Sequence, residues 1–356
     1  MKTFPENAEL NGRNVKFGID PTFPRLHLGH LVPLRIVREM QRAGKNVTIV
    51  LGTFTAQMGD PSGKDKTRPI LSKEEVKKNS EHILSQVNRF LAPDFRVWRN
   101  GEDSFDNMTV PELMNIVSKF TVQHMLSRDA FQKRIENDSS ISVHELIVPV
   151  LQGMDSVNLN TEIEIGGTDQ LFNFAVTRKL QEIHGQKPEV CVLVPIIHGT
   201  DGQKMSKSLG NCIFLDEKPS EIFGKCMSIP DTVMDEWIPL LTDRKKLSSA
   251  PMQRKKDMAF DIVKQLFSES TAKEALEHFE KTVQRKELPE EMKNVPPGNV
   301  IEVVTSIRGC SKSEARRLLK DGAVTVDNVK VDDSANVKVG QIVKVGKRNF
   351  GKCTQS

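Results

Sequence analysis

The sequence predicts an α/β fold, in which a Rossmann-like, doubly wound parallel sheet is followed by a helical domain and a small α+β domain. Apolar runs at 15–19, 47–52 and 190–197 are typical of buried strands, and helical patterns separate them. A capping box at 72–75 opens a helix that reaches about Leu91, and a helical pattern follows at 110–126. From 220 to about 284 the periodicity is helical throughout. Strand and turn signals return in the last sixty or so residues, which predicts a separate module there.

Length, charge and cysteine content restrict the class of protein. The 356 residues allow two or three domains with a substantial core. No apolar run reaches the ~20 residues of a membrane span, and the N-terminus lacks the apolar core of a signal peptide. The five cysteines are scattered without Cys-x-x-Cys spacing. We therefore expect reduced thiols, a cytoplasmic protein, no bound zinc and no membrane contact.

Composition along the chain suggests the domain limits. We expect a nucleotide-binding domain at 1–212, with an inserted region at about 93–165, and a helical domain at 213–285. A segment rich in proline and charge at 286–298 is typical of a linker. The remaining residues, 299–356, hold eleven Lys or Arg against six Asp or Glu, although the whole chain has a net charge of only +4. This basic module suggests contact with nucleic acid.

The segment 17–30 predicts a strand, a turn and a helix that begins near Leu28. Gly29 lies where the helix opens, and its missing Cβ allows a ligand to approach the backbone. His27 and His30 are three residues apart, so they share one face of the first turn. Two ring N–H donors beside a positive helix end suit an anion. Taken alone, the pair could equally lie on the surface or form half of a metal site.

A Gly-rich polar loop follows the third apolar run and contains the sequence Lys-Met-Ser-Lys-Ser at 204–208. Lys204 and Lys207 on a mobile loop could close over a triphosphate and neutralise the departing pyrophosphate. A short lysine-rich loop is usually only solvated. The pairing of this loop with the earlier His-Leu-Gly-His sequence at 27–30 is far more specific than either motif alone.

Three further stretches carry candidate polar residues. The loop after the second strand holds Asp60, Lys64 and Arg68, which also fit an ordinary charged surface loop. Gln152 and Asp155 are three apart on a predicted helix, so both can face one pocket. Asp169 follows a Gly-Gly turn, where it could accept from ribose hydroxyls or simply cap a helix.

In the tail, a capping sequence at 311–314 opens a short helix that ends before Gly322. Asp327 and Asn328 between the apolar runs 323–326 and 329–331 predict a hairpin. Its basic residues form a stripe, which on an isolated helix would more often be a solvated face. They are Lys312, Arg316, Arg317 and Lys320.

Together these motifs resemble a known family. His-Leu-Gly-His at 27–30 and Lys-Met-Ser-Lys-Ser at 204–208 are similar to the two signature sequences of class I aminoacyl-tRNA synthetases. The tail sequence at 311–326 resembles the S4 RNA-binding fold. The whole chain looks like a bacterial-type tyrosyl-tRNA synthetase. Gly-Ile-Asp-Pro-Thr at 18–22, Gly-Gly-Thr-Asp-Gln at 166–170 and the tail distinguish it from the tryptophan enzymes.

The resemblance implies two steps, in which tyrosine and ATP form tyrosyl-adenylate and the acyl group then passes to tRNA(Tyr). It implies ATP with Mg²⁺ as substrate, no tightly bound metal, an anticodon-side role for the helical domain, and a homodimer built on the inserted region. The residues implied for phosphate and leaving-group chemistry are Thr22, His27, His30, Lys64, Arg68, Lys204 and Lys207. Those implied for ATP binding are Asp20, Gly29, His30, Gly167, Asp169 and the loop residues Lys204, Met205, Ser206, Lys207 and Ser208. Those implied for the amino acid are Lys16, Thr55, Asp60, Asn100, Gln152, Asp155 and Gln170. The tail stripe would bind tRNA.

Two positions depart from the family pattern. The family usually has a tyrosine four residues before Gln152, against the substrate ammonium group, and this chain has Val148. Many members also have a tyrosine four residues before Asp20, and this chain has Lys16, which can still donate to a phenol.

The chain contains no tyrosine at all. One interpretation is that the enzyme charges tyrosine and that its own synthesis has become independent of that amino acid. A second is that the pocket has changed toward another aromatic amino acid. A third hypothesis is a non-catalytic RNA-binding relative that kept the fold. The histidine and lysine pairs and Asp155 favour the first.

Overall fold

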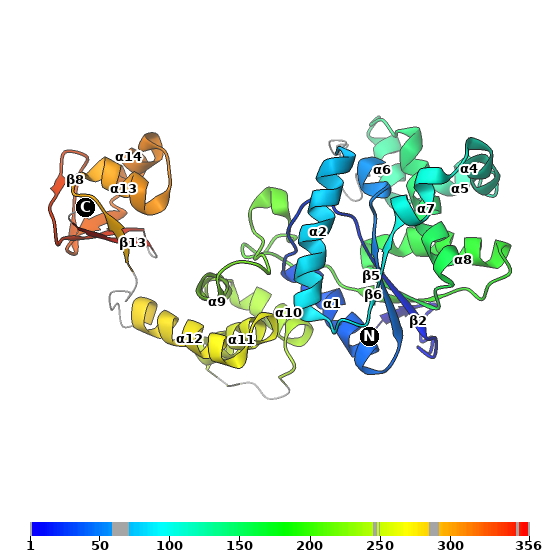
Figure 1. Ribbon diagram of the computed structural model, residues 1–356, viewed down its shortest axis with the longest axis horizontal. Coiled ribbons are helices and arrows are strands. Elements are labelled where there is room, and N and C mark those ends of the chain that lie inside the picture. Colours follow the sequence, from blue (N-terminus) through cyan, green and yellow to red (C-terminus); the bar gives the residue numbers. More distant parts are fainter. Residues whose placement is uncertain are drawn as a thin grey trace. The chain divides into compact units, whose positions relative to one another are not determined.

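The structure is a computed structural model that describes residues 2–58, 71–244, 248, 250–284, 292–346 and 349–354, with the backbone alone at 283–284. It divides into two compact units, Met1–Ala272 and Lys273–Ser356 (Figure 1). The predicted fold class is confirmed, because a mainly parallel sheet flanked by helices is followed by helices and then by an α+β module.

The sheet of the first unit has, among the described residues, six strands in the order β1-β6-β5-β2-β3-β4. Strands β2 to β6 are parallel, and β1 runs antiparallel along β6. The strand bounds are β1 Lys2–Phe4, β2 Asn14–Ile19, β3 Asn46–Leu51, β4 Arg96–Arg99, β5 Ile163–Gly167 and β6 Val190–Val194.

The order of the strands determines where a ligand can bind. From β2 the chain moves outward to β3 and β4, and then returns to β5 on the other side of β2. In open α/β sheets, ligands bind where the strand order reverses, beyond the carboxyl ends of the two central strands. Figure 1 shows α1 (Leu28–Arg42) and α2 (Lys73–Phe90) on one side of the sheet, and α7 (Val143–Leu159) and α8 (Leu171–Ile183) on the other.

Local sequence explains the first two helices. α1 begins after His27 and buries an apolar stripe with helical spacing that includes Leu31, Leu34 and Val37. α2 has the predicted capping box, in which Ser72 accepts from the backbone of Glu75 and the Glu75 side chain accepts from the backbone of Ser72.

Helices fill the chain between β4 and β5. The predicted helical pattern at 110–126 is interrupted, because the Thr121 side chain caps a new helix there. β4 lies inside the segment 93–165 that the sequence suggested as an insertion, and it pairs with β3 as part of the sheet. The bounds are α3 Asn100–Asp103, α4 Val110–Val117, α5 Val122–Leu126, α6 Asp129–Glu136 and then α7.

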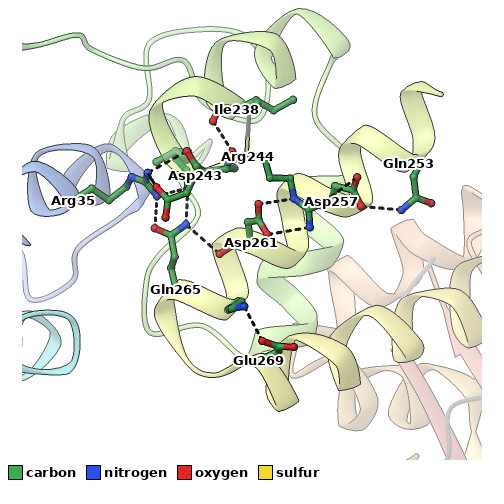
Figure 2. A network of polar contacts seen from close by, with 12 residues as sticks. Arg35, Ile238, Asp243, Arg244, Gln253, Asp257, Asp261, Gln265 and Glu269 are labelled. Carbon is green, nitrogen blue, oxygen red and sulfur yellow. Dashed lines mark hydrogen bonds and ion pairs between the residues drawn. The ribbon is translucent and has the colours of Figure 1, made fainter. Parts of the chain in front are cut away.

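The segment after the lysine-containing loop is helical where it is described, as predicted. Its helices are α9 Pro219–Met227, α10 Asp231–Leu241, α11 Pro251–Leu266 and α12 Glu269–Phe279. The Trp237 side chain of α10 is fully buried. Figure 2 shows a polar network in which Arg35 of α1 meets Asp243 and Gln265, close to the end of α10.

The C-terminal module has its own core and two sheets. One sheet has the strand order β10-β9-β12-β13-β7, and a second pairs β11 with β8. The predicted hairpin is present, with Asp327 and Asn328 at φ 47° and 69° in its two-residue turn. The bounds are β7 Lys293–Val295, β8 Gly298–Asn299, α13 Val300–Arg308, α14 Lys312–Lys320, β9 Val324–Val326, β10 Val329–Lys330, β11 Asn336–Val337, β12 Ile342–Val345 and β13 Asn349–Cys353.

β7 lies inside the segment 286–298 that the sequence suggested as a linker, and its parallel pairing with β13 makes 293–295 part of this sheet. The other domain limits stay predictions. Among the described residues, no helix is both long and apolar enough to cross a membrane.

Candidate active site

A cavity of about 920 Å³ lies beyond the carboxyl ends of β2 and β5. Most of the predicted site residues of the first unit line it, although they come from segments far apart in the sequence. They are Lys16, Asp20, Thr22, His27, Gly29, His30, Thr55, Asn100, Gln152, Asp155, Gly167, Asp169, Gln170 and 204–208.

The start of α1 forms one part of this cavity. The Nδ1 atom of His27 accepts from the backbone N–H of Gly29 at 3.1 Å, and the Nδ1 atom of His30 accepts from the backbone N–H of His27 at 3.2 Å. When Nδ1 accepts, a neutral imidazole carries its proton on Nε2. A Cβ on Gly29 would lie 2.9 Å from the His27 ring, so glycine is needed for this close approach.

Both rings are held neutral. Burial, and then the charge of Lys207, lowers the pKa of His27 to about 3. Burial and the neighbouring His27 and Lys207 lower the pKa of His30 well below its ordinary value. The two rings therefore offer N–H donors at neutral pH without carrying a charge, beside the positive end of a helix.

The loop that contains Lys204 and Lys207 covers the opposite wall. The Lys204 ammonium lies 3.9 Å from a carboxylate oxygen of Asp169, and the Lys207 ammonium lies 5.0 Å from the centre of the Phe23 ring. Asn211 stabilises the loop, since its side chain accepts from Ser206 N–H and donates to Asp201. Two cations and two neutral histidines thus line a single cavity.

Asp155 of α7 lies at the buried part of the cavity and is only 2 % exposed. Trp98 Nε1 donates to one of its oxygens at 3.0 Å, and Asn100 Nδ2 donates to the other at 3.1 Å. Burial raises the pKa of Asp155 to about 7, although Lys16 and these two donors lower it. A carboxylate in this position can accept a hydrogen bond from a ligand hydroxyl.

Lys16 faces Glu164 across the two central strands. The two residues are register partners of β2 and β5, their side chains are buried, and the ammonium lies 3.0 Å from Glu164 Oε1. Glu164, which is not among the residues predicted from sequence motifs, also lines the cavity. A signal was present, because Lys16 and Glu164 are opposite charges inside two otherwise apolar strands.

The side-chain amides of Gln152, Gln170 and Asn173 are linked by hydrogen bonds, and Asn173 belongs to α8. Asn173 Nδ2 donates to Gln152 Oε1 at 2.8 Å and to Gln170 Oε1 at 2.9 Å, which fixes both predicted glutamines. Val148 is buried at 3 % exposure and lines the cavity one turn before Gln152. Thr55 donates to Asp20 at 2.8 Å, and a Cβ on Gly52 would collide with both, so glycine is required beside them.

The remaining predicted residues fall into two groups. Asp60, Lys64 and Arg68 lie outside the described residues. The basic residues of the tail lie in the other unit on α14, where Ala315 and Leu319 are buried and the predicted stripe is exposed. It consists of Lys312, Arg316, Arg317 and Lys320.

Comparison with known proteins gives two family matches. Residues 11–296 match the family "tRNA synthetases class I (W and Y)", and residues 302–343 match the S4 domain. A tyrosine–tRNA ligase of Dehalococcoides mccartyi (strain CBDB1) is 44% identical, with 96% of this chain and 92% of that protein covered. One from Thermotoga maritima is 41% identical, with 94% of this chain and 89% of that protein covered.

Solved structures share the fold. A mitochondrial tyrosyl-tRNA synthetase of Aspergillus nidulans, truncated at its C-terminus, has a TM-score of 0.62 at 19% identity, with 74% of this chain and 84% of that chain covered. The tyrosyl-tRNA synthetase of Archaeoglobus fulgidus, complexed with L-tyrosine, has a TM-score of 0.58 at 19% identity, with 74% and 90% covered.

Proposed function

Because the chain belongs to the class I tRNA synthetases for tryptophan and tyrosine, we propose how its cavity carries out the reaction of that family. The chain catalyses the ATP-dependent ligation of tyrosine to tRNA(Tyr) through tyrosyl-adenylate, with release of pyrophosphate and AMP. Eight relatives that are 37–44% identical over most of the chain are tyrosine–tRNA ligases. A different amino acid, or a non-catalytic RNA-binding role, is therefore not favoured.

The first step joins the tyrosine carboxylate to the α-phosphorus of ATP, and the bond to the β-phosphate breaks. His27 with Thr22 donates to the γ-phosphate side in the transition state, and His30 contacts the adenosine ribose. Lys204 and Lys207 neutralise the departing pyrophosphate, together with Lys64 and Arg68. The observation that carries this proposal is that the two histidines and the two lysines of 204–208 line one cavity. No covalent nucleophile is needed, because positioning and fixed charge lower the barrier.

The remaining groups hold the two substrates. Asp20 and Asp169 bind the adenylate backbone and its ribose, aided by Gly29, Gly167 and the loop residues Met205, Ser206 and Ser208. The amino-acid head group binds near Gln152, Gln170 and Asp60, with Thr55 and Asn100 close by.

The phenol of tyrosine binds at Asp155. Its hydroxyl donates to the carboxylate, and its oxygen accepts from the ammonium of Lys16, which already donates to Glu164 and to the carbonyl of Gln152. Phenylalanine would remove the hydrogen bonds that the hydroxyl makes to Asp155 and Lys16, and a site built around a substrate hydroxyl rejects an analogue that lacks it.

Magnesium enters with ATP, bound to its phosphates. Among the described residues, no group of three or more His, Cys, Asp or Glu side chains is placed to hold a metal ion.

The C-terminal module binds tRNA through its exposed basic stripe. Lysine and arginine contacts to phosphate strengthen RNA binding without taking part in adenylate formation. Exchange of Arg316 and Arg317 for Ala should raise the KM for tRNA(Tyr) roughly tenfold and leave pyrophosphate exchange unchanged. Equal loss in both assays would argue against this role.

The protein forms a homodimer through the region before and including α7. Large apolar side chains are exposed on α4, α5, α6 and the start of α7, and patches of this kind mark protein interfaces. They are Val110, Met114, Val122, Ile135 and Val143, each more than half exposed. Sedimentation should give a dimer, and a monomer at working concentration would contradict this assignment.

We place the protein in the cytoplasm. All five cysteines are free thiols, and four of them are buried. Unpaired cysteines are usual in a reducing compartment.

Aminoacylation of a tRNA(Tyr) transcript with radiolabelled tyrosine tests the function. We expect charged tRNA from the unmodified protein, and an adenylate formation rate at least tenfold lower for Lys204→Ala, with tyrosine affinity retained. Lys179→Ala is the control, because Lys179 is an exposed lysine of α8 that pairs with Glu182 outside the cavity. No charging by the unmodified protein would contradict the proposal.

A further inference from the structure

We propose that Glu236 of α10 is a positioning residue for adenylate formation, and that it acts through His198 on the loop that carries Lys204. α10 supports both this loop and α1, the helix that begins at His27. This inference rests on the proposed function, and it adds residues outside both signature sequences.

Glu236 holds His198 by two contacts. One carboxylate oxygen accepts from the backbone N–H of His198 at 3.2 Å, and the other lies 2.6 Å from His198 Nδ1. The neighbouring Trp237 is fully buried and donates from Nε1 to the His198 carbonyl at 2.9 Å. Two successive residues of α10 therefore fix both the backbone and the ring of a single residue.

His198 in turn fixes the backbone position of Lys204. The two residues form an isolated antiparallel β-bridge, and the adjacent Met205 N–H donates to the Ile197 carbonyl at 3.1 Å. The position of the Lys204 backbone is thus set by the position of His198. Lys204 lines the cavity, so a shift at the base of the loop would move its ammonium relative to the triphosphate.

The other end of α10 is joined to α1. The carbonyls of Leu241 and Thr242 accept from Arg35 at 3.0 and 3.1 Å, which satisfies acceptors that a helix end leaves without partners. Arg35 also meets Asp243 and Gln265, as Figure 2 shows. A cation at this end is favoured by the helix dipole. α10 therefore contacts the helix that presents His27 and also holds the base of the loop that presents Lys204.

The Glu236–His198 contact is too exposed to add much to the stability of the fold. The His198 side chain is 52% exposed and that of Glu236 is 27% exposed. A side-chain contact this close to solvent contributes little to folding. Their geometric effect is larger, because a misplacement of about 1 Å in a catalytic group costs on the order of 100-fold in rate.

The test measures ATP–pyrophosphate exchange for Glu236→Ala and Glu236→Gln. We expect kcat to fall about tenfold for Glu236→Ala and less for Glu236→Gln, which retains an acceptor for the His198 N–H. The KM for tyrosine should not change. The matched control is Asp235→Asn, since Asp235 precedes Glu236 on the same helix and pairs with Arg254 instead. It should retain full activity.

A double-mutant cycle then tests the route through the loop. If Glu236 acts by placing Lys204, Glu236→Ala should have little further effect on kcat in the Lys204→Ala background. Multiplicative losses would overturn the inference, as would an unchanged kcat, a raised tyrosine KM, or equal losses in the control. The exchange activity of the unmodified protein distinguishes the proposed ligase function from the proposed role of Glu236. If the unmodified protein shows no exchange, the ligase function is contradicted. If the unmodified protein shows exchange and the Glu236 variants exchange equally fast, only the role of Glu236 is contradicted.

Discussion

The Lys16 ammonium lies 3.0 Å from Glu164, inside the sheet and beside the cavity. The two charges are register partners on the central strands β2 and β5. The charges of Glu164, Glu189 and Asp155 oppose the effect of burial and raise the pKa of Lys16. Burial, and then the neighbouring Glu164, raises the pKa of Glu189 well above its ordinary value.

Removing one member of this pair should destabilise the fold. Lys16→Met leaves the buried Glu164 without its cationic partner, and we expect the free energy of unfolding to fall by about 3–5 kcal/mol. The double variant Lys16→Met/Glu164→Gln should regain most of that loss. Urea denaturation of the three proteins measures both values, and a single variant as stable as the unmodified chain would contradict the account.

Asp155 should make tyrosine binding depend on pH. Its pKa of about 7 leaves part of the population protonated near neutrality, and only the ionised form accepts freely from the phenol. We expect the KM for tyrosine to fall as the pH rises from 6 to 8. The same series with Asp155→Asn should lose this trend and should also reduce the preference for tyrosine over phenylalanine. An unchanged pH profile in the variant would exclude this role.

Val148 tests whether the missing tyrosines affect substrate binding. It is buried and lines the cavity, at the position where the family usually has a tyrosine against the substrate ammonium group. Val148→Tyr should lower the KM for tyrosine several-fold, as one added hydrogen bond of about 1 kcal/mol implies. Val148→Phe has nearly the same size without the hydroxyl and should give no such gain. Equal effects of the two variants would assign the change to packing.

His27 should make stability sensitive to acid. Its pKa is about 3 in the folded chain and 6.5 in its ordinary state, so the unfolded chain binds this proton first as the pH falls. The free energy of unfolding therefore decreases below pH 6.5. Relative to His27→Gln, the unmodified protein should lose about 1.4 kcal/mol between pH 7.5 and 5.5. His82→Gln, at an exposed histidine, is the control. If the difference in the free energy of unfolding between the unmodified protein and His27→Gln does not change with pH, the prediction is refuted.

The sequence predicted the elements that local patterns define. The strand and helix around His27, the capping box at Ser72 and the hairpin at Asp327 follow from apolar periodicity and turn chemistry over a few residues. β1 was missed because three residues carry little periodicity, and its pairing with β6 joins positions almost two hundred residues apart. β7 was taken for linker because its sequence is polar and flanked by prolines.

The sequence predicted those residues of the site that belong to a recognisable motif. Gln152 and Asp155 were found from helical spacing, and His27, Gly29, His30 and all of 204–208 line one cavity. Glu164, Trp98 and Asn173 act through contacts with residues distant in sequence, which single-segment patterns do not reveal. The contact of Glu236 with His198 was missed for the same reason.

ATP–pyrophosphate exchange with each of the twenty amino acids in turn tests the central claim most directly. The account predicts exchange with tyrosine and a far lower rate with phenylalanine, because only tyrosine satisfies both Asp155 and Lys16. Exchange that is faster with another amino acid would contradict the assigned specificity. No exchange with any amino acid would contradict the catalytic role of the cavity.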